Sequence, residues 1–176
     1  FVILFFNEDT FALYILMYSY VQSIALISGL GLPHALIPFW LDYENKEEFL
    51  SSLLILMLGV SIIFYIPISY ILFLLVPISA EQINTALFIF LVFIFTIVLN
   101  HFAIGQALLR VKSKQFIYFW VNVLSSVLYI SLIFIFGAKP GNTLVTLIII
   151  NISVLLFQAL VSLKFSGISL KFIVRR

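Results

Sequence analysis

Five long runs of apolar residues, with no charged side chain in their middle, constrain this chain more than any other feature of its sequence. Each run has at least about 20 residues, the length that an α-helix needs to cross the hydrocarbon of a bilayer. A helix satisfies its own backbone polar groups, which a bilayer core requires because it offers no water. The sequence therefore predicts an all-α integral membrane protein.

The expected spans are residues 11–41, 49–76, 85–109, 116–136 and 144–165, with the end of another helix at 1–6 and a tail at 166–176. Only short polar segments separate the runs, so consecutive helices are expected to be antiparallel and to form a polytopic bundle. Six apolar residues cannot cross about 30 Å of hydrocarbon. We therefore expect residues 1–6 to end a helix whose beginning precedes this sequence.

The distribution of Lys and Arg predicts how the bundle is oriented. Eight of the nine Lys and Arg residues fall in alternate connecting segments or in the tail, and Lys139 alone falls on the other side. Loops rich in Lys and Arg stay in the cytoplasm. Segments 42–48, 110–115 and 166–176 are therefore expected to be cytoplasmic parts of a multi-pass protein.

Composition and spacing exclude several classes of function. Only 9% of the residues are charged, against about 25% in soluble domains, and 64% are hydrophobic. The chain has no cysteine, no glycine-rich phosphate loop and no sustained basic run, so no cofactor and no nucleic-acid partner is predicted. A membrane polymerase or glycosyltransferase would need catalytic residues in substantial loops. The loops here are short, so we predict that the chain is not an enzyme.

Uncharged polar side chains form stripes at helical spacing within the apolar runs. The stripes consist of Ser19, Gln22 and Ser23 in the first run, Tyr118, Asn122, Ser125, Ser126 and Tyr129 in the fourth, and Asn151, Gln158 and Ser162 in the fifth. Such stripes serve either as hydrogen bonds between packed helices or as the polar wall of a water-filled cavity. The candidate residues for a substrate pathway, chosen for polarity at membrane depth, are Gln22, His34, Asn100, His101, Asn122 and Asn151.

Three other features have more than one interpretation. Two distant histidines, His34 and His101, are too few to predict a metal site, and each either bonds within the bundle, contacts a ligand or acts as a protonation switch. Arg110 follows the last residue of the third run, at the expected membrane interface, where its side chain is expected to reach toward lipid phosphate. Gly29, Gly31 and Pro33 make the end of the first run its least regular part, either as a plain kink or as a gate.

Two stretches of the sequence carry a resemblance to a known family. Residues 14–49 read YILMYSYVQSIALISGLGLPHALIPFWLDYENKEEF, and residues 105–134 read GQALLRVKSKQFIYFWVNVLSSVLYISLIF. The first resembles the second helix and acidic cytoplasmic loop of polysaccharide-biosynthesis flippases of the Wzx type, with a Leu-Gly-Leu, two residues, Ala-Leu pattern at 30–36. The second is similar to the passage between the fourth and fifth helices of that family. The family belongs to the multidrug/oligosaccharidyl-lipid/polysaccharide exporter superfamily.

The resemblance implies that the chain forms most of the N-terminal lobe of a two-lobe transporter in a bacterial or archaeal cytoplasmic membrane. A C-terminal lobe of the same protein would complete the cavity, and alternating access would carry an undecaprenyl-diphosphate-linked oligosaccharide across. Relatives place arginines in the cavity, whereas this sequence has none at mid-membrane depth. Either the cationic contacts come from outside this segment, or charge does not hold the cargo here.

Two alternatives to this function are a multidrug exporter of the same superfamily and a structural membrane subunit. Coupling in the exporters usually depends on an acidic group within the N-terminal lobe, and the five runs contain none. A structural subunit would use the polar stripes for helix packing alone.

Overall fold

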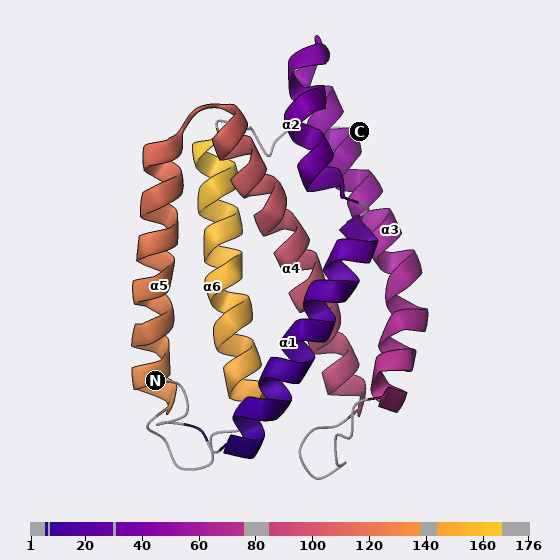
Figure 1. Ribbon diagram of the computed structural model, residues 1–176, viewed down its shortest axis with the longest axis vertical. Coiled ribbons are helices and arrows are strands. Elements are labelled where there is room, and N and C mark those ends of the chain that lie inside the picture. The colour runs from indigo at the N-terminus through magenta and orange to yellow at the C-terminus, as the bar shows by residue number, and fades with distance from the viewer. Residues whose placement is uncertain (1–5, 7, 30, 76–84, 138–143, 167–176) are drawn as a thin grey trace.

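The computed structural model describes residues 6, 8–29, 31–75, 85–137 and 144–166, whose regular structure is entirely helical. The helices are α1 (Glu8–Gly29), α2 (Leu32–Asp42), α3 (Lys46–Leu75), α4 (Thr85–Val111), α5 (Gln115–Gly137) and α6 (Leu144–Phe165). In Figure 1, α2 continues in the direction of α1, and each later helix reverses direction. The prediction of an all-helical chain is confirmed for these residues.

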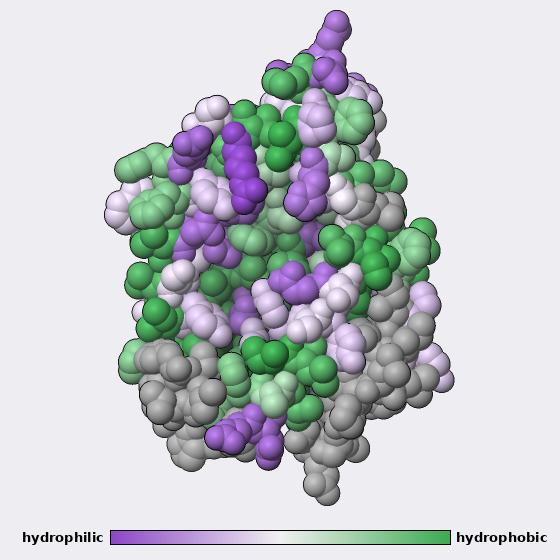
Figure 2. All heavy atoms as spheres, in the orientation of Figure 1, coloured by the Kyte–Doolittle hydropathy of each residue, from purple (hydrophilic) through white to green (hydrophobic). Residues whose placement is uncertain are grey.

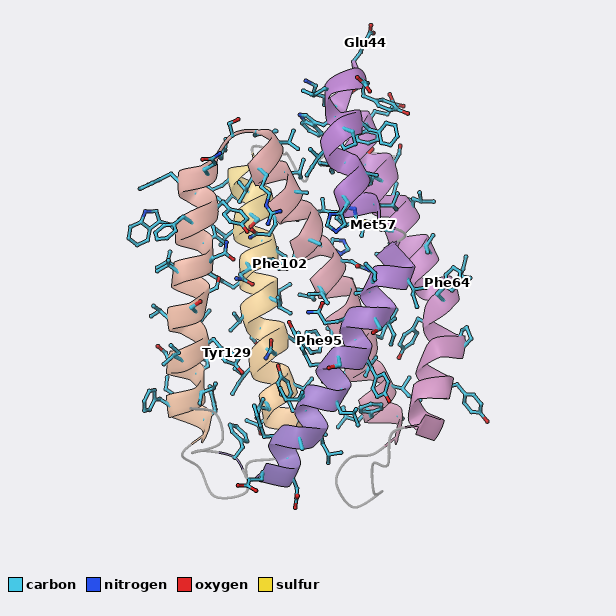
Figure 3. The ribbon with its side chains drawn as sticks, in the orientation of Figure 1. Glu44, Met57, Phe64, Phe95, Phe102 and Tyr129 are labelled. Atoms are coloured by element: carbon cyan, nitrogen blue, oxygen red, sulfur yellow. The ribbon has the colours of Figure 1, made fainter. Side chains whose placement is uncertain are left out.

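Five segments within the described residues are long and apolar enough to cross a membrane, in agreement with the five predicted spans. They are Glu8–Asp42, Glu48–Tyr65, Ala86–Val111, Gln115–Phe136 and Leu144–Phe165. Large apolar side chains such as those of Phe64, Phe116 and Phe119 are exposed on the outside of the bundle. Phe64 points away from the helices and Phe95 points between them (Figure 3). Large exposed apolar surfaces mark places where a protein contacts lipid or another protein.

The beginning of α3 differs from the expected loop 42–48, because the helix starts at Lys46. Asn45 accounts for the earlier start. Its Oδ1 accepts a hydrogen bond from the backbone N–H of Glu48 at 3.3 Å, and its Nδ2 donates to Glu48 Oε2 at 3.1 Å. This reciprocal cap satisfies a donor that the first turn of a helix leaves unpaired. The expected features at 1–5, 76–84, 138–143 and 167–176 lie outside the described residues.

The expected span 11–41 consists of two helices rather than one. Gly31 adopts a left-handed conformation, with φ at +66°, and precedes the first residue of α2. Pro33 lies in the first turn of α2, where its missing N–H costs no helical hydrogen bond. The irregularity predicted from Gly31 and Pro33 is therefore a complete break in the helix.

Replacing Gly31 with alanine tests this break. A Cβ at Gly31 would meet no atom within 4 Å, so only the left-handed backbone opposes the side chain. We expect Gly31→Ala to destabilise the protein by about 1 kcal/mol. The check is thermal unfolding in detergent, with Gly59→Ala in α3 as the control, because Gly59 also has open space but no positive φ. Equal midpoints for the two variants would contradict the expectation.

Helix α4 is the centre of the bundle and packs against all five other helices. One cluster of buried side chains, including Met17, Phe95 and Leu147, joins α1, α4 and α6. A second cluster, including Leu36, Met57 and Leu108, joins α2, α3 and α4. Both clusters include side chains of α4, so packing on two sides fixes the position of this helix and of the polar side chains that it carries.

Five of the Lys and Arg residues lie at the same end of the bundle, hereafter the basic end: Lys46, Arg110, Lys112, Lys114 and Lys164. Lys112 Nζ donates to the carbonyl of Ser166 at 2.5 Å, and Lys114 Nζ donates to that of Phe165 at 2.6 Å. Phe165 is the last residue of α6 and Ser166 follows it, so both carbonyls lie at the C-terminal end of the helix, where its dipole favours cations. The ammonium groups of Lys46 and Lys112 lie 5.8 and 5.2 Å from the centroid of the Trp40 ring.

Candidate functional site

A pocket of about 440 Å³, hereafter pocket 1, lies among α1, α2, α4, α5 and α6. Figure 2 shows hydrophilic side chains gathered in a hollow on the face of the bundle between α1 and α5, with apolar surface on both sides. The polar side chains that line pocket 1 are those of Tyr18, Gln22, His34, Asn100, Gln106, Arg110 and Tyr118. Pocket 1 therefore combines hydroxyl, amide, imidazole and guanidinium groups within an apolar bundle.

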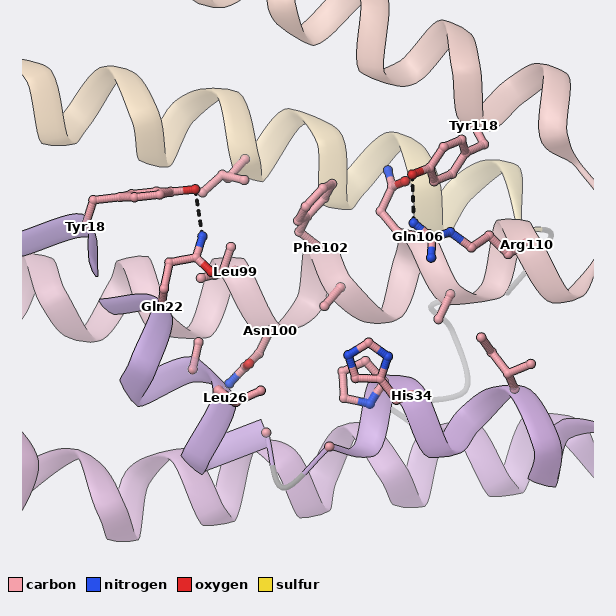
Figure 4. A pocket seen from close by; sticks show the side chains of 18 residues that line it. Tyr18, Gln22, Leu26, His34, Leu99, Asn100, Phe102, Gln106, Arg110 and Tyr118 are labelled. Atoms are coloured by element: carbon pink, nitrogen blue, oxygen red, sulfur yellow. Dashed lines mark hydrogen bonds between the residues drawn. The ribbon is translucent and has the colours of Figure 1, made fainter. Parts of the chain in front are cut away.

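Arg110 supplies the cation of pocket 1 at the basic end. Its Nη2 donates to the hydroxyl oxygen of Tyr118 at 2.8 Å, and its guanidinium lies 5.0 Å from the centroid of the Tyr118 ring (Figure 4). A guanidinium has five N–H donors, so one such bond leaves donors for a ligand. The sequence suggested contact with lipid phosphate for Arg110, and the structure places it on the wall of pocket 1.

Gln22 and His34 reach pocket 1 from α1 and α2. Gln22 Nε2 donates to the Tyr18 hydroxyl at 2.7 Å, which leaves the Gln22 carbonyl oxygen as an acceptor (Figure 4). The ring of His34 forms no hydrogen bond with any residue that the structure describes. Both candidates therefore lie where a ligand in pocket 1 would meet them.

Asn100 borders pocket 1, but its amide also joins three helices. It is only 4% exposed, and its Nδ2 lies 3.1 Å from the Ser28 hydroxyl of α1 and 3.3 Å from the Ser61 hydroxyl of α3. A Cβ at Gly29 would be 3.2 Å from Asn100 Oδ1, so glycine allows the close approach. Asn100 therefore combines helix packing with a place on the pocket wall.

His101 and Asn122 do not line a described pocket. His101 Nδ1 lies 2.8 Å from the carbonyl oxygen of Ile97 in its own helix. Asn122 Nδ2 donates to the Tyr118 carbonyl at 2.7 Å and to Gln106 Oε1 at 3.4 Å. Asn122 thus links α5 to α4, which corresponds to the helix-packing interpretation of its stripe.

A second pocket of about 370 Å³, hereafter pocket 2, lies beside pocket 1 and contains the sixth candidate, Asn151. Tyr18, Phe102 and Leu155 line both pockets and so stand between them. Asn151 Nδ2 donates to the hydroxyl of Tyr14, whose ring lies 6.0 Å from that of Tyr18. The structure thus brings Gln22, His34 and Asn100 together in pocket 1 and places Asn151 in its neighbour.

Gln106 is a site residue that was not predicted from the sequence. It is buried on α4, one helical turn before Arg110, and its Nε2 donates to the Ser162 hydroxyl at 3.3 Å. The spacing of Asn100, Ala103, Gln106 and Arg110 would have indicated one face of a helix. All four line pocket 1, so one face of α4 presents both amides and the Arg110 guanidinium to the pocket.

The side chains of the two linings offer hydrogen-bond donors, hydrogen-bond acceptors and one cation to a ligand. Hydroxyls, amides, an imidazole and a guanidinium donate and accept hydrogen bonds, and neither lining includes a carboxylate among the described residues. No group of three His, Cys, Asp or Glu side chains that could hold a metal ion occurs in the described part of the chain.

Comparison with models of protein families, with curated proteins and with solved structures finds no match to this chain. In the residues that it describes, the structure is all-α, with five helical segments long and apolar enough to span a membrane and with a polar pocket between helices.

Proposed function

We propose that the chain is most of the N-terminal lobe of a flippase that moves an undecaprenyl-diphosphate-linked oligosaccharide across the cytoplasmic membrane by alternating access. The observation that carries the proposal is pocket 1, a polar recess in an apolar bundle with a guanidinium at its basic end. A polar recess of this kind shelters a hydrophilic head group from hydrocarbon, while the lipid tail stays among the exposed apolar side chains. The resemblance to Wzx-type flippases supports the same function.

The charge of pocket 1 favours this cargo over the drugs of a multidrug exporter. A diphosphate is anionic and forms charge-assisted hydrogen bonds with a guanidinium. A cationic drug would be repelled by Arg110 and would find no carboxylate among the described lining residues. A structural subunit would use its polar stripes only as hydrogen bonds between packed helices, whereas several polar side chains here line an open recess.

The orientation in this proposal follows from the basic end. With Lys46, Arg110 and Lys114 on the cytoplasmic side, the end of pocket 1 that carries the guanidinium would receive the cargo from the cytoplasmic side. The face of the bundle that carries the pocket would lie toward the C-terminal lobe. The two lobes would then enclose the head group between them.

Filling pocket 1 tests the proposal. Ala103 lines the pocket and is half-buried, so a tryptophan at this position would occupy part of the space for the head group. We expect Ala103→Trp in the full-length protein to lower translocation of a lipid-linked oligosaccharide in reconstituted vesicles at least about 10-fold. The control is Ala12→Trp, because Ala12 is exposed on α1 and lines neither pocket. Wild-type translocation by a stably folded Ala103→Trp protein would refute the proposed role of pocket 1.

A further inference from the structure

Pocket 2 differs from pocket 1 in the kind of ligand that its lining can hold. All of its lining residues are uncharged, and the polar ones are Tyr18, Ser125, Ser126, Tyr129, Asn151 and Gln158. An ion placed there would lose its hydration without gaining a partner of opposite charge, which is costly in a membrane protein. A neutral molecule with many hydroxyl groups has no such cost.

Several polar groups in pocket 2 have hydrogen-bonding capacity left for a ligand. The amide of Gln158 forms no hydrogen bond within the described part of the chain. The hydroxyls of Ser125 and Ser126 donate to carbonyls of their own helix, those of Val121 at 2.6 Å and Asn122 at 3.0 Å. Because each hydroxyl oxygen also has acceptor lone pairs, the serines offer acceptors and Gln158 offers both donors and an acceptor.

Aromatic rings make up much of the rest of the lining. Tyr18, Phe102 and Tyr129 come from α1, α4 and α5, so rings border pocket 2 from three helices. Tyr18 is held in place because Gln22 donates to its hydroxyl and the ring of Phe95 lies 5.7 Å away. An aromatic face packs against the apolar C–H face of a sugar ring, while hydroxyl and amide groups bond to its edge.

The position of pocket 2 allows one molecule to occupy both pockets. Tyr18, Phe102 and Leu155 are the shared border, and Arg110 lies toward the basic end of pocket 1 (Figure 4). A cargo whose diphosphate bonds to Arg110 would extend past Phe102 with its uncharged part in pocket 2. The volume of about 370 Å³ falls within the range of small-molecule sites, roughly 300–1,000 Å³.

We infer that pocket 2 is a subsite for an uncharged saccharide, held by Gln158, Ser126 and the surrounding aromatic rings, next to the anion site at Arg110. This inference rests on the proposed function and extends it by naming the class of sugar that the lobe accepts. The two pockets then have different roles: pocket 1 binds the diphosphate of the cargo, and pocket 2 distinguishes one glycan from another.

The test measures affinity rather than transport, using the full-length protein in lipid nanodiscs and two probes. One probe is undecaprenyl diphosphate without sugar, and the other is undecaprenyl diphosphate that carries a neutral trisaccharide. For Gln158→Leu we expect affinity for the glycosylated probe to fall about 3–10-fold, the effect of losing one or two hydrogen bonds, with no change for the sugar-free probe. Ser153→Ala is the control, because Ser153 is exposed on α6 and bonds only to the Ile149 carbonyl.

Ser126→Ala provides a second variant with a smaller change in volume, and the same selective loss is expected of it. Equal weakening of both probes by both variants, or no weakening of either, would overturn the saccharide subsite. So would equal wild-type affinity for trisaccharides with and without a uronic acid, since an uncharged lining should disfavour the acid. If wild type binds neither probe, the proposed function itself fails. Binding of both probes without selective loss removes only the subsite.

Discussion

Replacing Gly105 with leucine is expected to prevent the bundle from packing. A Cβ at Gly105 would lie 2.8 Å from Ser162 Cβ and 3.6 Å from the Ala159 carbonyl oxygen, so α4 and α6 approach too closely for any side chain. Ser162 is fully buried, and its Cβ cannot move without moving the backbone of α6. Small residues allow such close approach between membrane helices. We expect Gly105→Leu to yield no monodisperse protein in detergent.

The milder Gly105→Ala variant tests the same contact between α4 and α6 through the free energy of unfolding. Overpacking should destabilise it by about 1–3 kcal/mol, which corresponds to a fall of roughly 2–4 °C in the unfolding midpoint per kcal/mol for a chain of this size. Gly59→Ala should instead be neutral or stabilising, because a Cβ there meets nothing within 4 Å and alanine favours helices. The opposite signs identify contact between α4 and α6 as the cause. A Gly105→Ala midpoint equal to or above that of Gly59→Ala would show that this contact is unimportant.

Replacing Arg110 with glutamine is expected to lower translocation of the lipid-linked oligosaccharide by about 10–100-fold. The reason is the loss of charge-assisted hydrogen bonds to a diphosphate, each stronger than a bond between neutral groups. Arg110→Lys should restore only part of the activity, since an ammonium lacks the planar pair of donors. Translocation by the full-length protein in vesicles is the measurement, with thermal unfolding to verify that the variants fold.

Lys164→Gln is the matched control for this charge. Lys164 lies at the same end of the bundle in the last turn of α6, is exposed, and lines neither pocket. Its replacement removes the same unit of charge and should leave translocation unchanged. If both substitutions reduce translocation equally, the general positive charge of the basic end matters rather than the position of Arg110. If Arg110→Gln has no effect, pocket 1 does not bind the diphosphate through this residue.

The polar stripes illustrate how far periodicity predicts a site. Helical spacing placed Ser125, Ser126 and Tyr129 on one face of α5, and the structure places all three along pocket 2. The same reasoning grouped Ser162 with Gln158 on α6. Ser162 is instead buried against Gly105 and Gln106, because α4 lies close to α6 there. Spacing along one helix cannot show which stretch of a face a neighbouring helix covers.

The residues on α4 show the complementary case. Asn100 was identified by polarity, Gln106 was missed, and Arg110 was considered at the membrane interface. The structure brings all three to one pocket because α4 is the central helix and presents that face to α1, α2 and α5. Two other candidates, His101 and Asn122, bond within α4 or between α4 and α5 and line neither pocket.

The sequence by itself determined the class of structure. Apolar length, the absence of charge within the runs and the placement of turn residues specify helices of membrane-spanning length, and Gly31 with Pro33 indicates where the first span is interrupted. These properties are local, since each helix forms its backbone hydrogen bonds within itself. Only the tertiary structure decided which polar side chains meet. Helices from distant parts of the chain border the pockets. Their positions depend on contacts elsewhere, where Gly105 of α4 packs against Ser162 of α6 and Asn100 bonds to Ser28 of α1 and Ser61 of α3.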